Sequence, residues 1–297
     1  MRSKITSVRV LILMVVGVIL SAPASAQLPN ENADKPLEIT ASQTLEWHRN
    51  DEKYIARGDV VVVQGDVTIR ADMIVADYRE TAAAAMDIYR LTATGNVTIE
   101  SRGNVARGDL AVYDVAGGLA TMTGEDLALV GVDQTVSATD KFEYMVPQGR
   151  LRAIGGAVAT RGVDRLMADE LGAIFEENAQ GAREVKTLTA DGNVVIKTQN
   201  ETLRGARGIY DAATNIAQIF ENVRIERDQN VLEGQRAEIN LTTNISKMYG
   251  DASAAGTAAT PDNLIGAPTA TGRVRGVFFP GGVNNPASNQ AAPPEAP

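Results

Sequence analysis

The chain has 297 residues, of which 44% are hydrophobic and only 4% aromatic, with no Cys, one His, one Trp and a formal charge of −9. These values exclude a disulfide framework, a thiolate nucleophile, and zinc sites built from Cys or from several His. The acidic balance also argues against a nucleic-acid surface, which needs clustered Lys and Arg. We therefore expect no metal, no cofactor and no nucleic-acid partner.

The N-terminus predicts a cleaved export signal. Basic residues precede the apolar run 10–20, and small residues follow it up to Ala24-Ser25-Ala26. This order matches the three regions of a secretory signal peptide, and the run is shorter than the roughly 20 residues of a membrane-spanning helix. We expect residues 1–26 to be removed and the mature chain, beginning at Gln27, to reside in the periplasm. A retained membrane anchor is the alternative.

The middle of the chain has the pattern of a β protein. Short runs of Val, Ile, Thr and Tyr alternate with Gly-Asn, Gly-Asp and Gly-Gly pairs, for example Gly95-Asn96 and Gly192-Asn193. We interpret these pairs as turn signals between strands. Because side chains alternate along a strand, Val97 and Ile99 should share one face and Thr98 the other. The pattern predicts an all-β chain.

The same region repeats at an offset of 97 residues. The segment 91–99, LTATGNVTI, aligns with 188–196, LTADGNVVI, and Tyr113-Asp114 aligns with Tyr210-Asp211. We expect one β unit over residues 27–250, with leading strands at 37–53 and two copies at about 54–150 and 151–247.

One stretch, near residues 124–129, departs from this alignment. Leu127 and Leu129 align with Arg224 and Glu226. A single-residue bulge in one copy would explain the mismatch, because a one-residue slip exchanges the two faces of a strand.

Positions that stay apolar in both copies define a candidate inward face. Within each strand they lie at even spacing, as a single buried face requires. They are Ile74, Tyr78, Val97, Ile99, Tyr113, Phe142, Tyr144, Leu171, Phe175, Val194, Ile196, Tyr210, Ile239 and Leu241.

Residues 251–297 are rich in Ala, Gly and Pro, and we expect a flexible tail. The basic and apolar segment 273–280 stands out within it. Two interpretations are open. The segment adds a strand to a sheet edge, in this molecule or in a partner, or it is an ordinary piece of tail.

The acidic residues permit a two-carboxylate glycosidase hypothesis, which the pattern does not favour. Asp114 and Asp211 each follow a Tyr just before a turn, where an Asp side chain caps the turn. Asp72 and Asp169 occupy equivalent repeat positions, and a catalytic acid has no need to occur twice. His48 has no nucleophile near it in the sequence. We expect a protein that is not an enzyme.

The ordered motifs resemble the OstA-like domain family of lipopolysaccharide-transport proteins. They are the Ala-x-Gly-Asn-Val-x-Ile runs at 93–99 and 190–196, the Arg-Gly-x4-Tyr-Asp runs at 107–114 and 204–211, and the Ala-Asp pairs at 71–72 and 168–169. The resemblance covers about residues 37–250 and is greatest to the periplasmic bridge members. It implies an elongated, slightly twisted antiparallel β-jelly roll with an apolar trough.

For function, the resemblance implies that the inward residues bind the acyl chains of lipid A. It implies that the chain bridges the inner and outer membranes during lipopolysaccharide export and outer-membrane assembly. The implied partners are lipopolysaccharide, an inner-membrane LptC-like subunit, an outer-membrane LptD-like barrel and further copies of the chain, joined head to tail. The alternatives are an LptC-like subunit, a secreted β-helix that acts as an adhesin or on polysaccharides, and a purely structural envelope protein.

Overall fold

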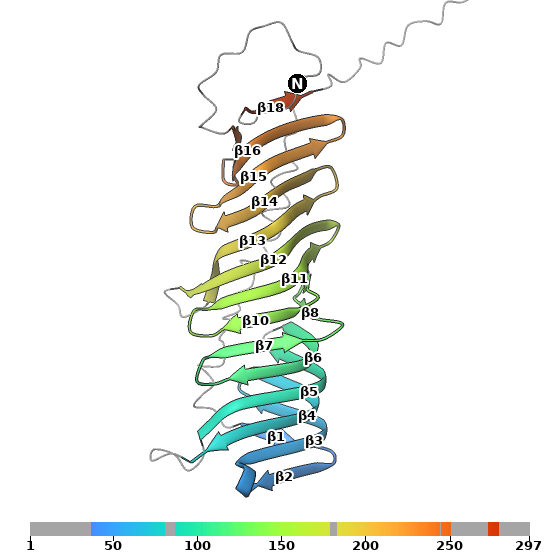
Figure 1. The fold of residues 1–297 in the computed structure, drawn as a ribbon, viewed down its shortest axis with the longest axis vertical. Coiled ribbons are helices and arrows are strands. Elements are labelled where there is room, and N and C mark those ends of the chain that lie inside the picture. Colours follow the sequence, from blue (N-terminus) through green and yellow to red (C-terminus); the bar gives the residue numbers. More distant parts are fainter. Residues whose placement is uncertain are drawn as a thin grey trace, which may run out of the picture.

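The chain folds into one elongated stack of antiparallel strands. The computed structural model describes residues 37–80, 87–101, 103–178, 183–243, 245–250 and 273–278. The strands run across the long axis and stack along it, from β2 at one end to β18 at the other (Figure 1). The predicted all-β, antiparallel jelly-roll class is confirmed. The predicted signal peptide lies outside the described residues, and so does most of the predicted tail.

The strands belong to a single sheet. In chain order they are β1 (Glu38–Thr40), β2 (Thr44–His48), β3 (Lys53–Gln64), β4 (Val67–Arg79), β5 (Asp87–Ser101), β6 (Asn104–Asp114), β7 (Leu119–Thr123), β8 (Ala128–Val130), β9 (Thr135–Ser137), β10 (Lys141–Met145), β11 (Arg150–Arg161), β12 (Asp164–Glu177), β13 (Arg183–Lys197), β14 (Thr202–Asp211), β15 (Ile216–Arg227), β16 (Asn230–Asn240), β17 (Ile245–Tyr249) and β18 (Arg275–Val277). A short 3-10 turn, Arg49–Asp51, joins β2 to β3. No helix among the described residues is long and apolar enough to cross a membrane.

The pairs Gly95-Asn96 and Gly192-Asn193 lie inside long strands, so their interpretation as turns between strands is wrong, whereas Gly65-Asp66 and Gly117-Gly118 do lie in turns between strands. Gly95 and Asn96 lie within β5, with φ angles of 80° and 47°. The register of β5 shifts at this point against both β4 and β6. Two successive left-handed residues accommodate an extra residue, which bends a strand without ending it.

An aspartate on the neighbouring strand holds each of these bulges. Asn96 donates to Asp72 at 3.0 Å, and Asn193, in the equivalent bulge of β13, donates to Asp169 at 2.9 Å. The repeated aspartates therefore have a structural partner. Because bulges recur at the middle of successive strands, each long strand is divided into two arms.

Strand bounds recur at the spacing seen in the sequence. Strands β9, β10 and β11 begin and end 97 residues after β1, β2 and β3.

The structure also accounts for the alignment mismatch near residues 124–129. Leu129 pairs with Ala106 and Ile225 pairs with Leu203, so these two residues hold equivalent places although they are 96 residues apart. Strand β15 continues through a bulge between Phe220 and Val223, whereas the first copy is interrupted between β7 and β8.

The hydrophobic core lies between the two arms, along the line of bulges. Val60, Val97, Val194 and Val223, each close to a bulge, are at most 1% exposed. The core continues as one cluster from Ile39, in β1, to residues in β16 and β17. A continuous apolar interior is therefore built from one side of every long strand.

Ion pairs across the outer face predict a pH-dependent stability. Arg152 donates to both carboxylate oxygens of Glu170 at 2.6 Å and to Glu143 at 2.8 Å. The bond from Arg152 lowers the pKa of Glu170 below 4.5. A lowered pKa means that the carboxylate stabilises the fold above its unfolded pKa and that this contribution is lost as the pH falls through the folded value.

We expect Glu170→Gln to cost about 1–2 kcal/mol at pH 7. Because wild type loses the same contribution in acid, the difference should shrink as the pH falls below 4.5. Urea unfolding of both proteins at pH 7 and 3.5 measures this. Glu176→Gln, which breaks an exposed pair with Lys186, is the control and should change little. An equal loss at both pH values would contradict the assignment.

Candidate lipid-binding trough

Cross-strand partners arrange the inward side chains into three parallel rows. Residues directly opposite each other in a sheet share a face, so the pairings can be followed from strand to strand. The central row is Ala56, Ile74, Ala93, Ala111, Met122, Phe142, Ala153, Leu171, Ala190, Gly208, Ile219, Ala237 and Met248.

Two further rows run beside the central row, one on each arm. The tyrosine row is Trp47, Tyr54, Ala76, Leu91, Tyr113, Ala120, Tyr144, Leu151, Ala173, Leu188, Tyr210, Ala217 and Ile239. The aliphatic row, beyond the bulges, is Ile39, Val62, Ile69, Ile99, Ala106, Leu129, Val136, Ala159, Leu166, Ile196, Leu203, Ile225 and Leu232.

Burial differs between the rows. The central row is buried except at Ala111 and Met248, which are half-buried. Through the middle of the molecule the other two rows are half-buried, for example at Tyr113, Leu129 and Leu166. An apolar strip along the stack is thus partly open to solvent while the line beneath it is packed. We take this partly open apolar strip as the candidate trough.

The structure places the predicted inward residues on this apolar side. Ile74, Phe142 and Leu171 belong to the central row, four residues to the tyrosine row, and Ile99 and Ile196 to the aliphatic row. One core cluster contains Ile74, Val97, Ile99, Phe142, Leu171, Val194, Ile196, Tyr210, Ile239 and Leu241. The cluster does not include Tyr78, Tyr113, Tyr144 or Phe175.

Sequence reasoning missed most of the aliphatic row. In β4 the inward positions change from Ile69 and Ala71 to Ile74 and Ala76, because the register shifts at Asp72. Strict alternation cannot follow a face across such a shift. The repeated Asp-Asn bulge was the signal that could have located it.

An aromatic cluster covers the β2 end of the tyrosine row. The indole of Trp47 stacks on Tyr54, with ring centroids 5.5 Å apart, and its Nε1 donates to the hydroxyl of Tyr78 at 2.8 Å. The guanidinium of Arg49 lies 4.0 Å from the centre of the Trp47 ring. Trp47 is still 50% exposed on this terminal strand.

Two tyrosines of the row, Tyr113 and Tyr210, keep neutral hydroxyl groups. Burial raises the pKa of Tyr113, and the neighbouring Asp114 raises it further. The same causes raise the pKa of Tyr210, whose hydroxyl donates to Asn215 at 2.9 Å. These side chains therefore add polar groups to the trough without adding charge.

The remaining polar candidates have structural partners. The carboxylate of Asp114 accepts from the Gly117 amide at 3.1 Å, and that of Asp211 accepts from the Thr214 amide at 2.8 Å, so both cap turns as predicted. Asp77 lies 3.5 Å from Lys53 on the adjacent strand. In the part of the chain that the structure describes, no group of three or more acidic or His side chains could hold a metal ion.

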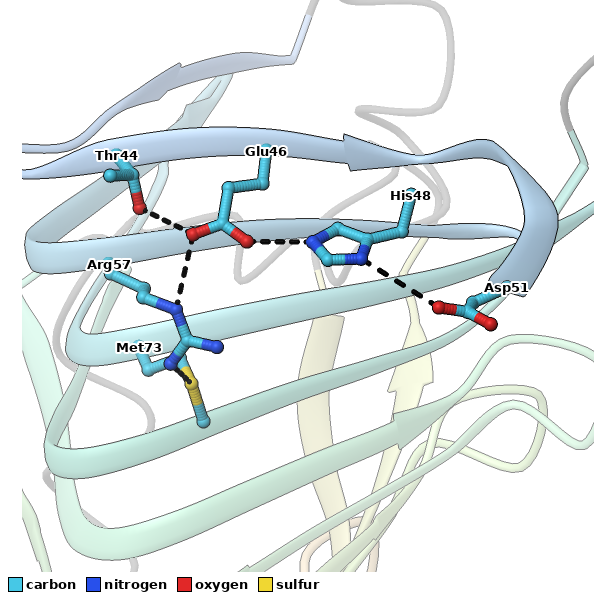
Figure 2. Close-up of polar contacts among 6 residues, drawn as sticks. All are labelled: Thr44, Glu46, His48, Asp51, Arg57 and Met73. Atoms are coloured by element: carbon cyan, nitrogen blue, oxygen red, sulfur yellow. Dashed lines mark hydrogen bonds and ion pairs between the residues drawn. The ribbon is translucent and has the colours of Figure 1, made fainter.

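His48 belongs to a polar cluster on the outer face of the β2 edge (Figure 2). Its ring lies 2.7 Å from Glu46 and 3.7 Å from Asp51. Glu46 also accepts from Thr44 at 2.9 Å and lies 3.4 Å from Arg57. Hydrogen bonds from His48 and Thr44 lower the pKa of Glu46, so it is ionised at neutral pH. The cluster fixes a negative charge on the terminal strand.

Comparison with known proteins assigns the family. The model for the LptA/(LptD N-terminal domain) LPS transport proteins matches residues 38–140 and, a second time, residues 135–245. The two matches cover most of the chain. The chain belongs to this family. It therefore has a role in lipopolysaccharide transport.

One solved structure that aligns is LptH, the LptA-homologous periplasmic component of the lipopolysaccharide transport device of Pseudomonas aeruginosa. The alignment covers 84% of this chain and 99% of LptH, with 12% identity and a TM-score of 0.19. No curated protein sequence matches significantly.

The β-helix alternative is wrong, because every strand pairing among the described residues is antiparallel. A β-helix adhesin or polysaccharide-active protein would need parallel coils.

Proposed function

We propose that this chain is an LptA-like periplasmic bridge that binds the acyl chains of lipid A in its trough. The observation that carries the proposal is the continuity of the three apolar rows, which begin on β1, β2 or β3 and end on β16 or β17. An acyl chain laid along them stays out of water over its length. Burial contributes about 0.8 kcal/mol per methylene, so a chain of about twelve carbons gains roughly 10 kcal/mol. No chemical step is required.

The two ends of the sheet support the bridging part of the proposal. Among the described residues β2 pairs with β3 alone and β17 with β16 alone, so each terminal strand presents an unpaired edge. Such edges bind further strands through their backbone groups. Head-to-tail joining of copies would extend the trough from an LptC-like subunit toward an LptD-like barrel, because a head-to-tail contact that does not close generates a filament.

Site-specific photocrosslinking in cells tests lipid binding. The half-buried positions Ile99, Leu129 and Leu166 should give lipopolysaccharide adducts. Thr98, beside Ile99 but on the opposite face, should give none. The central row is a poor choice for probes because its side chains are packed. Adducts distributed without regard to face would contradict the trough.

A further inference from the structure

The sheet contains an internal joint between the two matched units. There, β7 pairs with β10 and β8 pairs with β9. Met122 lies opposite Phe142, and Leu129 lies opposite Val136. On one side of the joint, β7 and β8 share strand β6; on the other, β10 and β9 share β11. Two short strands therefore meet two short strands.

The C-terminal end of the sheet has the arrangement of the first half of this joint. On β6, Ala111 pairs with β7 and Ala106, five residues earlier, pairs with β8. On β16, Ala237 pairs with β17 and Leu232, again five residues earlier, pairs with β18. The tail segment is thus a strand of this molecule, and it takes the place that β8 has in the joint.

The N-terminal end has the arrangement of the second half. Strands β1 and β2 lie 97 residues before β9 and β10 and pair with β3 as those pair with β11. Their outer edges have no partner among the described residues. Leu45, on β2, is 60% exposed, whereas its equivalent Phe142 is 6% exposed in the joint.

We infer that β17 and the tail strand β18 together form the C-terminal docking edge, which receives β2 and β1 of a second copy in the register of the internal joint. This inference rests on the head-to-tail assembly proposed above. The second family match ends at residue 245, where β17 begins, so the edge lies almost wholly beyond it and β18 lies outside both matches.

Applying the register of the internal joint to the contact between two copies predicts which residues of the two copies face each other. Met248 pairs with Ala237 as Met122 pairs with Ala111, so Leu45 of the second copy should lie opposite Met248. The next pair is then Glu46 with Lys247. Opposite charges facing each other across strands stabilise the pair. Figure 2 shows the Glu46 carboxylate already held by its neighbours on the outer face of β2.

Strand β18 carries the second contact. Its Arg275 lies opposite Glu233 and 3.4 Å from that carboxylate. The ring of Phe278 lies over Gly276, within 2.6 Å of where a Cβ would be, and fills the place of a side chain there. Phe278 is 71% exposed. In the transferred register Ile39 of the second copy meets Gly276, so docking would cover this ring.

Disulfide trapping tests the register, and the chain has no Cys to interfere. Mixing Leu45→Cys with Met248→Cys, and Thr40→Cys with Arg275→Cys, should give crosslinked dimers on oxidation. Leu45→Cys with Ser246→Cys, two residues out of register, should crosslink at least tenfold less, because diagonal partners are about 7–8 Å apart and a disulfide needs a Cα separation below about 7 Å.

The contribution of β18 is tested separately in the full-length chain. Gly276→Pro, which cannot remain in a ladder, and Phe278→Ala should each raise the dissociation constant of assembly at least tenfold in sedimentation experiments. Lys247→Glu should do the same, while Lys197→Glu, in central strand β13, should not. The thermal unfolding midpoints of Gly276→Pro and Phe278→Ala should stay at the wild-type value, because β18 is a short peripheral strand.

The outcomes separate the two proposals. If wild type stays monomeric at all concentrations, head-to-tail assembly fails and this inference fails with it. If wild type assembles while Gly276→Pro assembles equally well or better, β18 is no part of the docking edge and only this inference is overturned. If the protein assembles but the Thr40→Cys and Arg275→Cys variants do not crosslink, only this inference is overturned as well.

Discussion

Leu166→Asp should weaken lipopolysaccharide binding about a hundredfold while leaving the chain folded. Leu166 lies in the aliphatic row between Ala159 and Ile196. Losing a buried Leu contact costs about 1.5–3 kcal/mol, and every 1.4 kcal/mol is about a factor of ten in affinity. A carboxylate facing an acyl chain without a partner adds a desolvation cost. Because Leu166 is half-buried, the Asp keeps access to water in the unliganded protein.

The control is Val132→Asp, which makes the same chemical change on a hairpin tip where Val132 is 89% exposed. Lipopolysaccharide titration followed by fluorescence, with circular dichroism to verify folding, measures both variants. Wild-type affinity in Leu166→Asp would rule out the aliphatic row as a lipid contact. An equal loss of lipopolysaccharide affinity in Val132→Asp would mean that the added negative charge, and not the position of Leu166, weakens binding.

Gly192→Val should destabilise the fold by about 3–4 kcal/mol, because it adds a steric clash to backbone strain. Gly192 has a φ of 77°, and a Cβ there would lie 2.1 Å from a carboxylate oxygen of Asp169. That carboxylate is held by Asn193, so it cannot move away without losing its hydrogen bond. The bulge, and with it the bend of β13, should be lost.

Gly103→Val separates the two causes. Gly103 has a φ of 82° with nothing within 4 Å of its Cβ position, so only strain of about 1–2 kcal/mol is expected. Urea unfolding midpoints for both variants provide the measurement. If Gly192→Val costs no more than Gly103→Val, the clash with Asp169 does not constrain the bulge.

The local chemistry of the chain was readable from its residues. Alternation near Val97 predicted strands, and the position of Asp114 and Asp211 after Tyr predicted turn caps that accept amide hydrogens. The mismatch at Leu127 and Leu129 correctly indicated a one-residue slip. The strands and the turn caps depend on residues close together in sequence, so a local pattern was sufficient for them. The slip was visible because the two copies could be compared.

The error at the glycine pairs has a physical origin. Gly-Asn occurs in tight hairpins and in bulges because both require left-handed backbone angles. What distinguishes them is whether the chain beyond the pair continues beside the same neighbour. At Gly95-Asn96 the neighbour is β4, where Asp72 binds Asn96. That contact joins residues 24 apart, which no local pattern reveals.

The sequence by itself determined the fold class, the family and a minority of the inward residues. These follow from side-chain alternation and from motifs that occur twice. Only the tertiary structure decided that each long strand bends at a bulge into two arms, that the apolar residues form three rows, and that Arg275–Val277 pairs with β16. The physical reason is that register and strand partners are set by contacts between distant residues.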